Sequence, residues 1–281
     1  METRKWKRDT CNPSRRRKRY CYSQKNLLKI RNAWNRREPR KIHATEYDDL
    51  WNQLRNHIHN CNHESCWLKQ PFMRGKVDDD IKDSFAPMQP REWIKNKVEW
   101  LSSTDILDVM TQYEKTYKHF DFLGPSPIDY REVVLGQCVW DELCKFDLHK
   151  MLQRGKTQIG IVFNLDTHDK SGSHWVAMFI DVPHRGIYYF DSTGDAMPLY
   201  LNQFVTTIME QGKKMNMHFR FKQNHPKEHQ QGGTECGIYV LYFIVNMIHH
   251  GNFKMFNSRN HTIPDKMMEE LRDDFFNENK N

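Results

Sequence analysis

The sequence predicts an α+β protein in which helices flank a mixed central sheet, with a small helical region on the N-terminal side. The runs 174–182 and 187–192 are rich in β-branched and aromatic residues, and only a Pro-His-Arg-Gly turn separates them. They therefore predict a hairpin of neighbouring strands. Residues 238–245 are apolar on every side and predict a buried helix that begins at Cys236 and packs on the sheet.

The first 41 residues carry most of the positive charge. They contain 16 Lys or Arg and three acidic residues, a net charge of +13, while the whole chain carries +7. We expect residues 1–41 to form a flexible basic arm. The run Arg-Arg-Arg-Lys-Arg at 15–19, with aromatic residues nearby, favours non-specific binding of nucleic acid. A nuclear import signal and a solvated tail are the alternatives. The aromatic neighbours are Trp6, Tyr20, Tyr22 and Trp34.

Residues 42–91 predict a helical accessory region. Tyr47, Leu50, Trp51 and Leu54 recur at spacings of three and four and make one amphipathic face. A short span after this helix is crowded with potential zinc ligands, but they alternate more tightly than in common zinc modules, so we expect no metal. These residues are His57, His59, Cys61, His63 and Cys66.

Residues 92–281 predict the main domain. Apolar spacing indicates helices near 103–117, within 133–146 and at 264–275, and further strands at 158–165 and 219–221. Cys138 and Cys144, in the second helical stretch, are expected to be core thiols.

Three side chains in this domain suggest nucleophilic chemistry. Cys236 follows a polar, glycine-bearing loop and starts the buried helix, where unpaired N–H groups favour a thiolate. Packing of Cys236 as an ordinary core thiol is the alternative. His174 opens one strand of the hairpin and Asp191 closes the other, so both lie at the same end of the sheet. Together they supply a nucleophile, a general base and a carboxylate that orients the base.

The same motifs carry a family resemblance. His174-Trp175, Asp191 17 residues after the histidine, and Gln230-x5-Cys236-Gly resemble the cysteine protease clan of the SUMO-specific proteases and adenovirus protease. The resemblance is closest to the viral branch of nucleocytoplasmic large DNA viruses, typified by the African swine fever virus protease. It extends from about Cys61, in a Cys-x4-Cys element, to the C-terminus, and it includes a Trp-Leu-x4-Ile segment at 100–106.

The resemblance implies roles for these residues. His174 would be the general base, Asp191 its orienting partner and Cys236 the nucleophile. Gln230 would help form the oxyanion hole, with Gln231 as the neighbouring candidate. The swine fever enzyme, by that resemblance, has asparagine where Asp191 stands, and Asp191 follows the commoner cellular pattern. No cofactor is implied. Trp100 and Trp175 would narrow the substrate channel over a Gly-Gly sequence beside the scissile bond.

We therefore expect a thiol-dependent endopeptidase that cleaves viral core or capsid polyproteins after Gly-Gly. An isopeptidase that removes SUMO or another ubiquitin-like modifier, and a nucleic-acid-binding virion component without activity, are the alternatives. Acetyl transfer by a related fold is disfavoured, because no acetyl-donor site is visible in the sequence.

The expected location is the host cytoplasm, in the virus factory, and the virion core, with nuclear import through the basic run as the alternative. Seven cysteines without framework spacing suit a reducing compartment. No apolar run reaches about 18 residues, so no membrane partner is expected. The protein is expected to act as a monomer.

Overall fold

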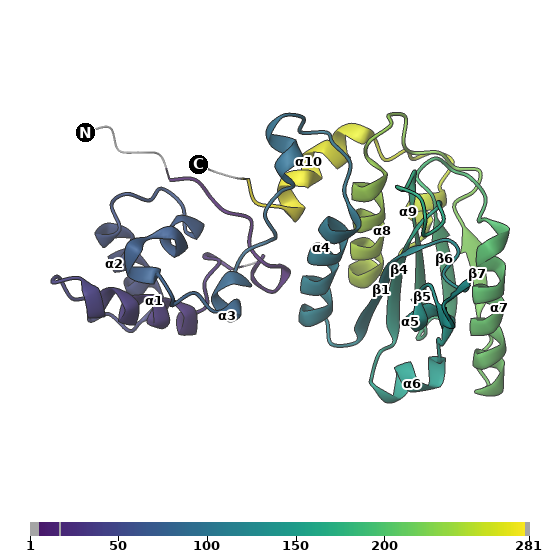
Figure 1. Ribbon diagram of the computed structural model, residues 1–281, viewed down its shortest axis with the longest axis horizontal. Coiled ribbons are helices and arrows are strands. Elements are labelled where there is room, and N and C mark those ends of the chain that lie inside the picture. The colour runs from purple at the N-terminus through teal and green to yellow at the C-terminus, as the bar shows by residue number, and fades with distance from the viewer. Residues whose placement is uncertain (1–5, 17, 279–281) are drawn as a thin grey trace. The chain divides into compact units, whose positions relative to one another are not determined.

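The computed structural model describes residues 6–16 and 18–278, which fall into two compact units (Figure 1). The first unit comprises Met1–Met88 together with Asp273–Asn281, and the second comprises Gln89–Arg272. This division departs from the expected one, because no boundary falls near residue 41. Residues 1–5 and Arg17 of the predicted arm lie outside the described residues.

The predicted basic arm is folded rather than separate from the accessory region. Helix α1 (Gln24–Arg37) is capped by Ser23, whose side chain accepts a hydrogen bond from the Asn26 N–H, and it packs on α2 (Tyr47–His57). Its apolar face is buried, and its Lys and Arg side chains lie on the outer faces. The segment is therefore an amphipathic helix, although its high net charge suggested a flexible arm. The unit also contains η1 (Pro13–Arg15), η2 (Ser65–Lys69), η3 (Pro71–Met73) and α3 (Asp79–Lys82).

The aromatic residues of the arm pack inside the first unit. Tyr20 stacks on Trp51 with ring centroids 4.2 Å apart, and Tyr22, fully buried, stacks on Trp67. Trp6 also packs edge-on against Trp51. These rings contribute to a hydrophobic core, so the expectation that they stack on nucleic-acid bases is not supported by their burial.

Six of the seven cysteines are paired in disulfides. The pairs are Cys11–Cys21, Cys61–Cys66 and Cys138–Cys144, and Cys236 is the free thiol. The expectation of unpaired core thiols at Cys138 and Cys144 was wrong, because the chain turns back on itself between them. Sequence spacing does not report such turns.

A five-stranded mixed sheet organises the second unit, in the order β1-β4-β5-β6-β7. Strands β1 and β4 are parallel, as are β6 and β7, whereas β4-β5 and β5-β6 are antiparallel. This is the predicted α+β architecture. The strands are β1 (Phe120–Pro127), β4 (Gln158–Asn164), β5 (Trp175–Asp181), β6 (Gly186–Phe190) and β7 (Arg220–Gln223).

Two parts of the second unit differ from the sequence-based expectation. Strand β1 contains Gly124 and two prolines, which argue against a strand, but it lies at the sheet edge, where missing N–H donors are tolerated. The predicted helix within 133–146 is instead a small hairpin followed by a single helical turn. These elements are β2 (Val133–Val134), β3 (Gln137–Cys138) and α5 (Asp141–Cys144).

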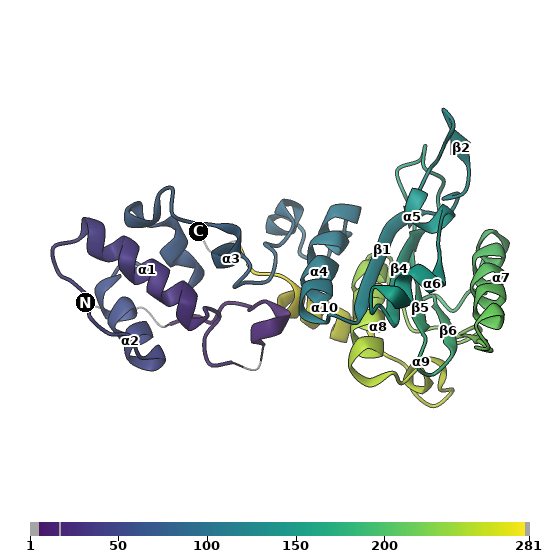
Figure 2. The same ribbon diagram turned by 90° about the horizontal axis from the view of Figure 1, so that it is seen from below.

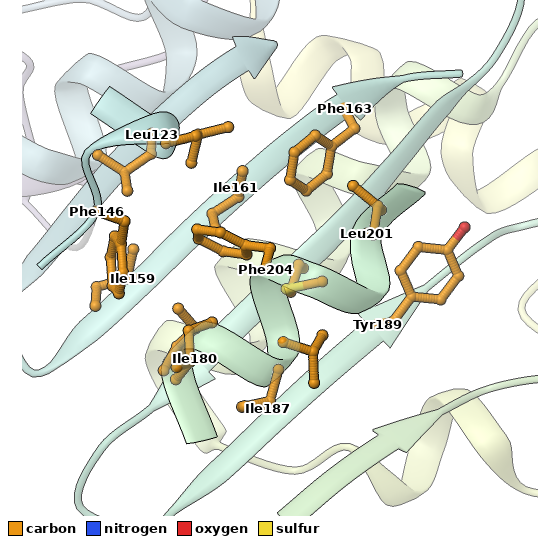
Figure 3. Packing of buried hydrophobic residues seen from close by; sticks show 14 of the residues in the cluster. Leu123, Phe146, Ile159, Ile161, Phe163, Ile180, Ile187, Tyr189, Leu201 and Phe204 are labelled. Carbon is orange, nitrogen blue, oxygen red and sulfur yellow. The ribbon is translucent and has the colours of Figure 1, made fainter. Parts of the chain in front are cut away.

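Helices cover both faces of the sheet (Figures 1 and 2). Helices α4 (Ser103–Thr116) and α8 (Cys236–His250) lie on one face, and α7 (Leu199–Lys214) lies on the other. Strand residues such as Ile161 and Ile180 pack against Phe204 of α7 in a continuous core (Figure 3). The remaining helices are η4 (Arg91–Ile94), α6 (Leu148–Gln153), α9 (Lys254–Asn257) and α10 (Asp265–Phe275). Within the described residues, no helix has the length and apolar character needed to cross a lipid bilayer.

Candidate active site

The hairpin brings His174 and Asp191 together. His174 directly precedes β5 and Asp191 directly follows β6, and the two strands are antiparallel with Ala177 opposite Phe190. His174 Nε2 lies 2.7 Å from Asp191 Oδ1. Both side chains are largely buried, so this hydrogen bond is shielded from water.

Cys236 completes this group from a helix that packs on the sheet. It is the first residue of α8, which packs on β5, and its side chain is 2% exposed. Burial lowers the pKa of His174, but hydrogen bonds to Asp191 and Cys236 outweigh that effect and raise it to about 10. His174 therefore carries its proton at neutral pH, between a carboxylate and the sulfur.

Asp191 is held by contacts that the sequence did not reveal. Its Oδ1 also accepts from the backbone N–H and the hydroxyl of Thr193, at 2.9 and 2.7 Å. Asn224 bonds both the N–H and the carbonyl of Asp191, at 2.9 and 2.6 Å. These partners fix the carboxylate toward His174. Asn224 is 33 residues away in sequence, so no local pattern could have identified it.

The two glutamine candidates are in different environments. Gln230 is 4% exposed, its Oε1 accepts from Ser192 Oγ at 2.7 Å, and its Nε2 donates to the Gly232 carbonyl at 2.7 Å. Gln231 is exposed, and its backbone N–H bonds to Asp265. Of the two, Gln230 has the ordered side chain that an oxyanion donor needs.

Trp100 and Trp175 are both neighbours of Leu101, Trp100 in the sequence and Trp175 through a hydrogen bond. The Trp175 ring is buried and donates from Nε1 to the Leu101 carbonyl at 2.9 Å. Trp100 precedes Leu101 and is 39% exposed. Gly237, next to Cys236, faces Leu101 so closely that a Cβ would lie 2.9 Å from the leucine Cβ. The segment at 100–101 therefore lies against the start of α8. The Trp175 ring is buried, whereas the Trp100 side chain is partly exposed.

The zinc candidates of the first unit do not form a metal site. Cys61 and Cys66 are joined in a disulfide, which removes their thiolates as ligands. Nowhere in residues 6–16 and 18–278 do three His, Cys, Asp or Glu side chains gather to hold a metal ion.

Comparisons with known proteins identify several relatives of this chain. Residues 155–281 match the Ulp1 protease family, C-terminal catalytic domain. The thiol-protease candidate R355 of Acanthamoeba polyphaga mimivirus is 32% identical over 187 residues, covering 66% of this chain and 60% of that protein. A relative from African swine fever virus, named a SUMO-1 cysteine protease, is 25% identical over 202 residues, covering 66% of this chain and 72% of that protein.

The fold comparison covers nearly the whole chain. The crystal structure of the African swine fever virus protease aligns over 95% of both chains with a TM-score of 0.71 and 20% identity, which is a similarity of fold. The matching family and the named relatives are cysteine or thiol proteases. The match to the Ulp1 protease family covers residues 155–281, less than half of the chain. The chain's match spans about 60% of the mimivirus relative.

Proposed function

We propose that the chain is a thiol-dependent endopeptidase with Cys236 as nucleophile, His174 as acid and base, and Asp191 as the orienting carboxylate. The observation that carries this proposal is that His174, 2.7 Å from Asp191 Oδ1, also interacts with Cys236 at the start of the buried helix α8. A buried cysteine with only a structural role would not need a histidine held by a carboxylate in this way.

The proposed reaction has two steps. The Cys236 sulfur attacks the scissile carbonyl carbon, and protonated His174 donates its proton to the leaving amine, which leaves a thioester. Neutral His174 then takes a proton from water, the resulting hydroxide attacks the thioester carbonyl, and the sulfur leaves as an anion beside protonated His174, which restores the starting state. The Gln230 amide and the Cys236 N–H would stabilise the negative oxygen that forms in each step.

We propose viral core or capsid polyproteins as substrates, cleaved after Gly-Gly. The viral origin of the relatives and the position of Trp175 and Trp100 beside Leu101 support this choice. Bulky rings beside the nucleophile would leave room only for small side chains next to the scissile bond. Removal of a ubiquitin-like modifier is the second candidate, because the swine fever virus relative is named a SUMO-1 cysteine protease.

A direct comparison of substrates tests these proposals. The full chain and Cys236→Ala are incubated with a polyprotein that contains Gly-Gly sites and, separately, with SUMO-conjugated protein. Cleavage of the polyprotein by the intact chain alone, with new N-termini after Gly-Gly, is the expected result. Preferential release of SUMO would replace the polyprotein proposal with the isopeptidase. Equal turnover by Cys236→Ala would end the thiol mechanism.

We further propose that basic residues of the first unit bind nucleic acid without sequence preference and hold the enzyme in the virus factory and virion core. Lys7, Lys18 and Arg19 are exposed and can contact phosphates, although the neighbouring rings are packed inward. Nuclear import through 15–19 gives the alternative location. Fractionation of infected cells and purified particles separates the two.

A further inference from the structure

We propose that Ser192 and Asp265 are positioning residues that hold the Gln230 amide where the oxyanion forms. The inference rests on the proposed function, and it adds two residues that neither bond Cys236 nor belong to the predicted site. Both act through a continuous chain of hydrogen bonds that joins the residue after Asp191, the Gln230 side chain, the loop before Cys236 and the start of α10.

The Gly232 carbonyl and Ser192 orient the Gln230 amide. A carbonyl can only accept, so the Gly232 oxygen, 2.7 Å from Gln230 Nε2, fixes which end of the amide carries the N–H groups. The Ser192 hydroxyl, fully buried, donates to Oε1 at 2.7 Å. The Ser192 carbonyl also accepts the N–H groups of His229 and Gln230, both at 2.9 Å. One Nε2 hydrogen is thereby committed to Gly232, and the second is left for a substrate oxygen.

Asp265 holds the loop that carries the Gly232 carbonyl. Its Oδ2 accepts the N–H groups of Gln231 at 3.0 Å and Gly232 at 2.7 Å. Its Oδ1 accepts from the Tyr239 hydroxyl at 2.9 Å, and Tyr239 lies on α8, three residues after Cys236. One carboxylate thus links the loop to the helix that carries the nucleophile. Loss of this carboxylate frees Gly232, and Gln230 then loses the acceptor that orients it.

Loss of Ser192 or Asp265 should raise the energy of the transition state and should not weaken substrate binding. A full negative charge exists on the substrate oxygen only after the sulfur has attacked, so a misplaced Gln230 lowers kcat and leaves KM nearly unchanged. Alkylation of Cys236 by iodoacetamide passes through no oxyanion. Its rate therefore reports the reactivity of the thiol without the contribution of Gln230.

The test measures both reactions on the full chain with Ser192→Ala and Asp265→Ala. On a peptide that ends in Gly-Gly-aminomethylcoumarin, each variant should lose about tenfold in kcat, as for one lost hydrogen bond, with KM within about twofold. Alkylation should keep its wild-type rate. Asp265→Asn should recover most of the loss, because its amide oxygen can accept the two loop N–H groups.

Matched controls come from the same unit. Ser126→Ala removes another buried serine hydroxyl, which bonds the Pro127 carbonyl. Asp147→Ala removes another carboxylate from a helix start, where it caps the Lys150 N–H of α6. Both should cleave the peptide at the wild-type rate, so an equal loss in these controls would mean a general loss of stability and overturn the inference.

A double-mutant cycle with Gln230→Ala decides whether the two residues act through Gln230. Gln230→Ala alone should lose about a hundredfold or more in kcat, and adding Ser192→Ala or Asp265→Ala should then change little. If the kcat losses multiply in the Gln230→Ala background, or if alkylation slows by the same factor, the positioning role is overturned. In either case, cleavage by the intact chain would still support the proposed function. An intact chain that cleaves neither peptide nor protein conjugate would overturn the proposed function and this inference together.

Discussion

At His174, burial and hydrogen bonding act in opposite directions on one proton. Burial alone would favour the neutral ring, yet Asp191 and Cys236 raise the pKa to about 10. The imidazolium is therefore the resting form at neutral pH. The sulfur of Cys236, the proposed nucleophile, therefore has a positive charge as its neighbour.

Cys236→Ser should remove peptide cleavage by on the order of 10⁴-fold or more, because a hydroxyl is a far weaker nucleophile than a thiolate beside imidazolium. The fold should be retained, since the two side chains are nearly the same size. The measurements are kcat/KM on the Gly-Gly peptide and the thermal midpoint. Turnover close to that of the intact chain would contradict the assignment of the nucleophile.

Asp191→Asn should be milder and should change the pH profile. An asparagine oxygen can still face His174, but the negative charge that raises the pKa of His174 is lost. The ring then gives up its proton at lower pH, so the alkaline limb of kcat/KM should move toward neutrality. An unchanged profile would show that Asp191 does not control the proton on His174.

Glu64 in the first unit provides a prediction about stability. Burial raises the pKa of its carboxyl from 4.5 to about 7, although the Cys21 N–H and the Trp51 indole N–H, at 3.1 and 2.8 Å, partly oppose this shift. Because the folded pKa lies above the unfolded one, the folded state favours the protonated acid. The stabilisation is full below about pH 4.5 and is lost as pH rises through about 7.

The expected loss of unfolding free energy between these limits is about 3 kcal/mol. Urea unfolding followed by tryptophan fluorescence at about pH 5 and about pH 8 measures it. Glu64→Gln cannot ionise, so this part of the pH dependence should disappear in the variant. A slope that persists unchanged in Glu64→Gln would assign it to other groups.

At the scale of elements, the start of α8 packs tightly against the segment that leads into α4. Gly237→Ala would place a Cβ 2.9 Å from the Leu101 Cβ, closer than side chains pack. We expect a destabilisation of about 1–3 kcal/mol and a loss of cleavage, because the Leu101 carbonyl also holds the Trp175 ring.

The thermal midpoint and kcat/KM of Gly237→Ala measure both effects. Gly233→Ala is the control, since its Cβ would meet nothing within 4 Å in the loop before Cys236. If Gly237→Ala and Gly233→Ala have the same thermal midpoint and kcat/KM, close packing against Leu101 is not the reason that position 237 requires glycine.

At the scale of the whole molecule, the first unit is a folded body whose surface carries much of the positive charge. Deleting residues 1–41 would remove α1 and expose the apolar residues it covers, so such a truncation reports on folding as well as on charge. Lys18→Glu with Arg19→Glu changes only exposed side chains. This pair should weaken binding to single- or double-stranded DNA at low salt without changing the thermal midpoint.

The measurement is the slope of log affinity against log salt. Its magnitude should fall by about 0.7–0.9 for each phosphate that the double variant no longer neutralises. Cleavage of the short Gly-Gly peptide should be unaffected. Identical slopes for the intact chain and the double variant would exclude these two residues from nucleic-acid binding.

The sequence by itself determined the fold class and the composition of the candidate site. The hairpin of β5 and β6 was visible as two apolar runs around one turn, so the meeting of His174 and Asp191 followed from antiparallel geometry. Helix α8 was visible because a run that is apolar all round must be buried, which placed Cys236 at its start. These features depend on residues that are close together in the sequence, so the sequence alone is enough to predict them.

Tertiary structure alone decided the rest. The charge of residues 1–41 suggested an arm, but the burial of Tyr22 and the apolar face of α1 make it part of a core. The disulfides and the contacts of Asp191 with Asn224 and of Asp265 with the Gln230 loop join residues whose sequence separation gives no signal. Such contacts depend on where the chain returns in space, because a hydrogen bond requires atoms to lie within about 3 Å whatever their distance along the chain.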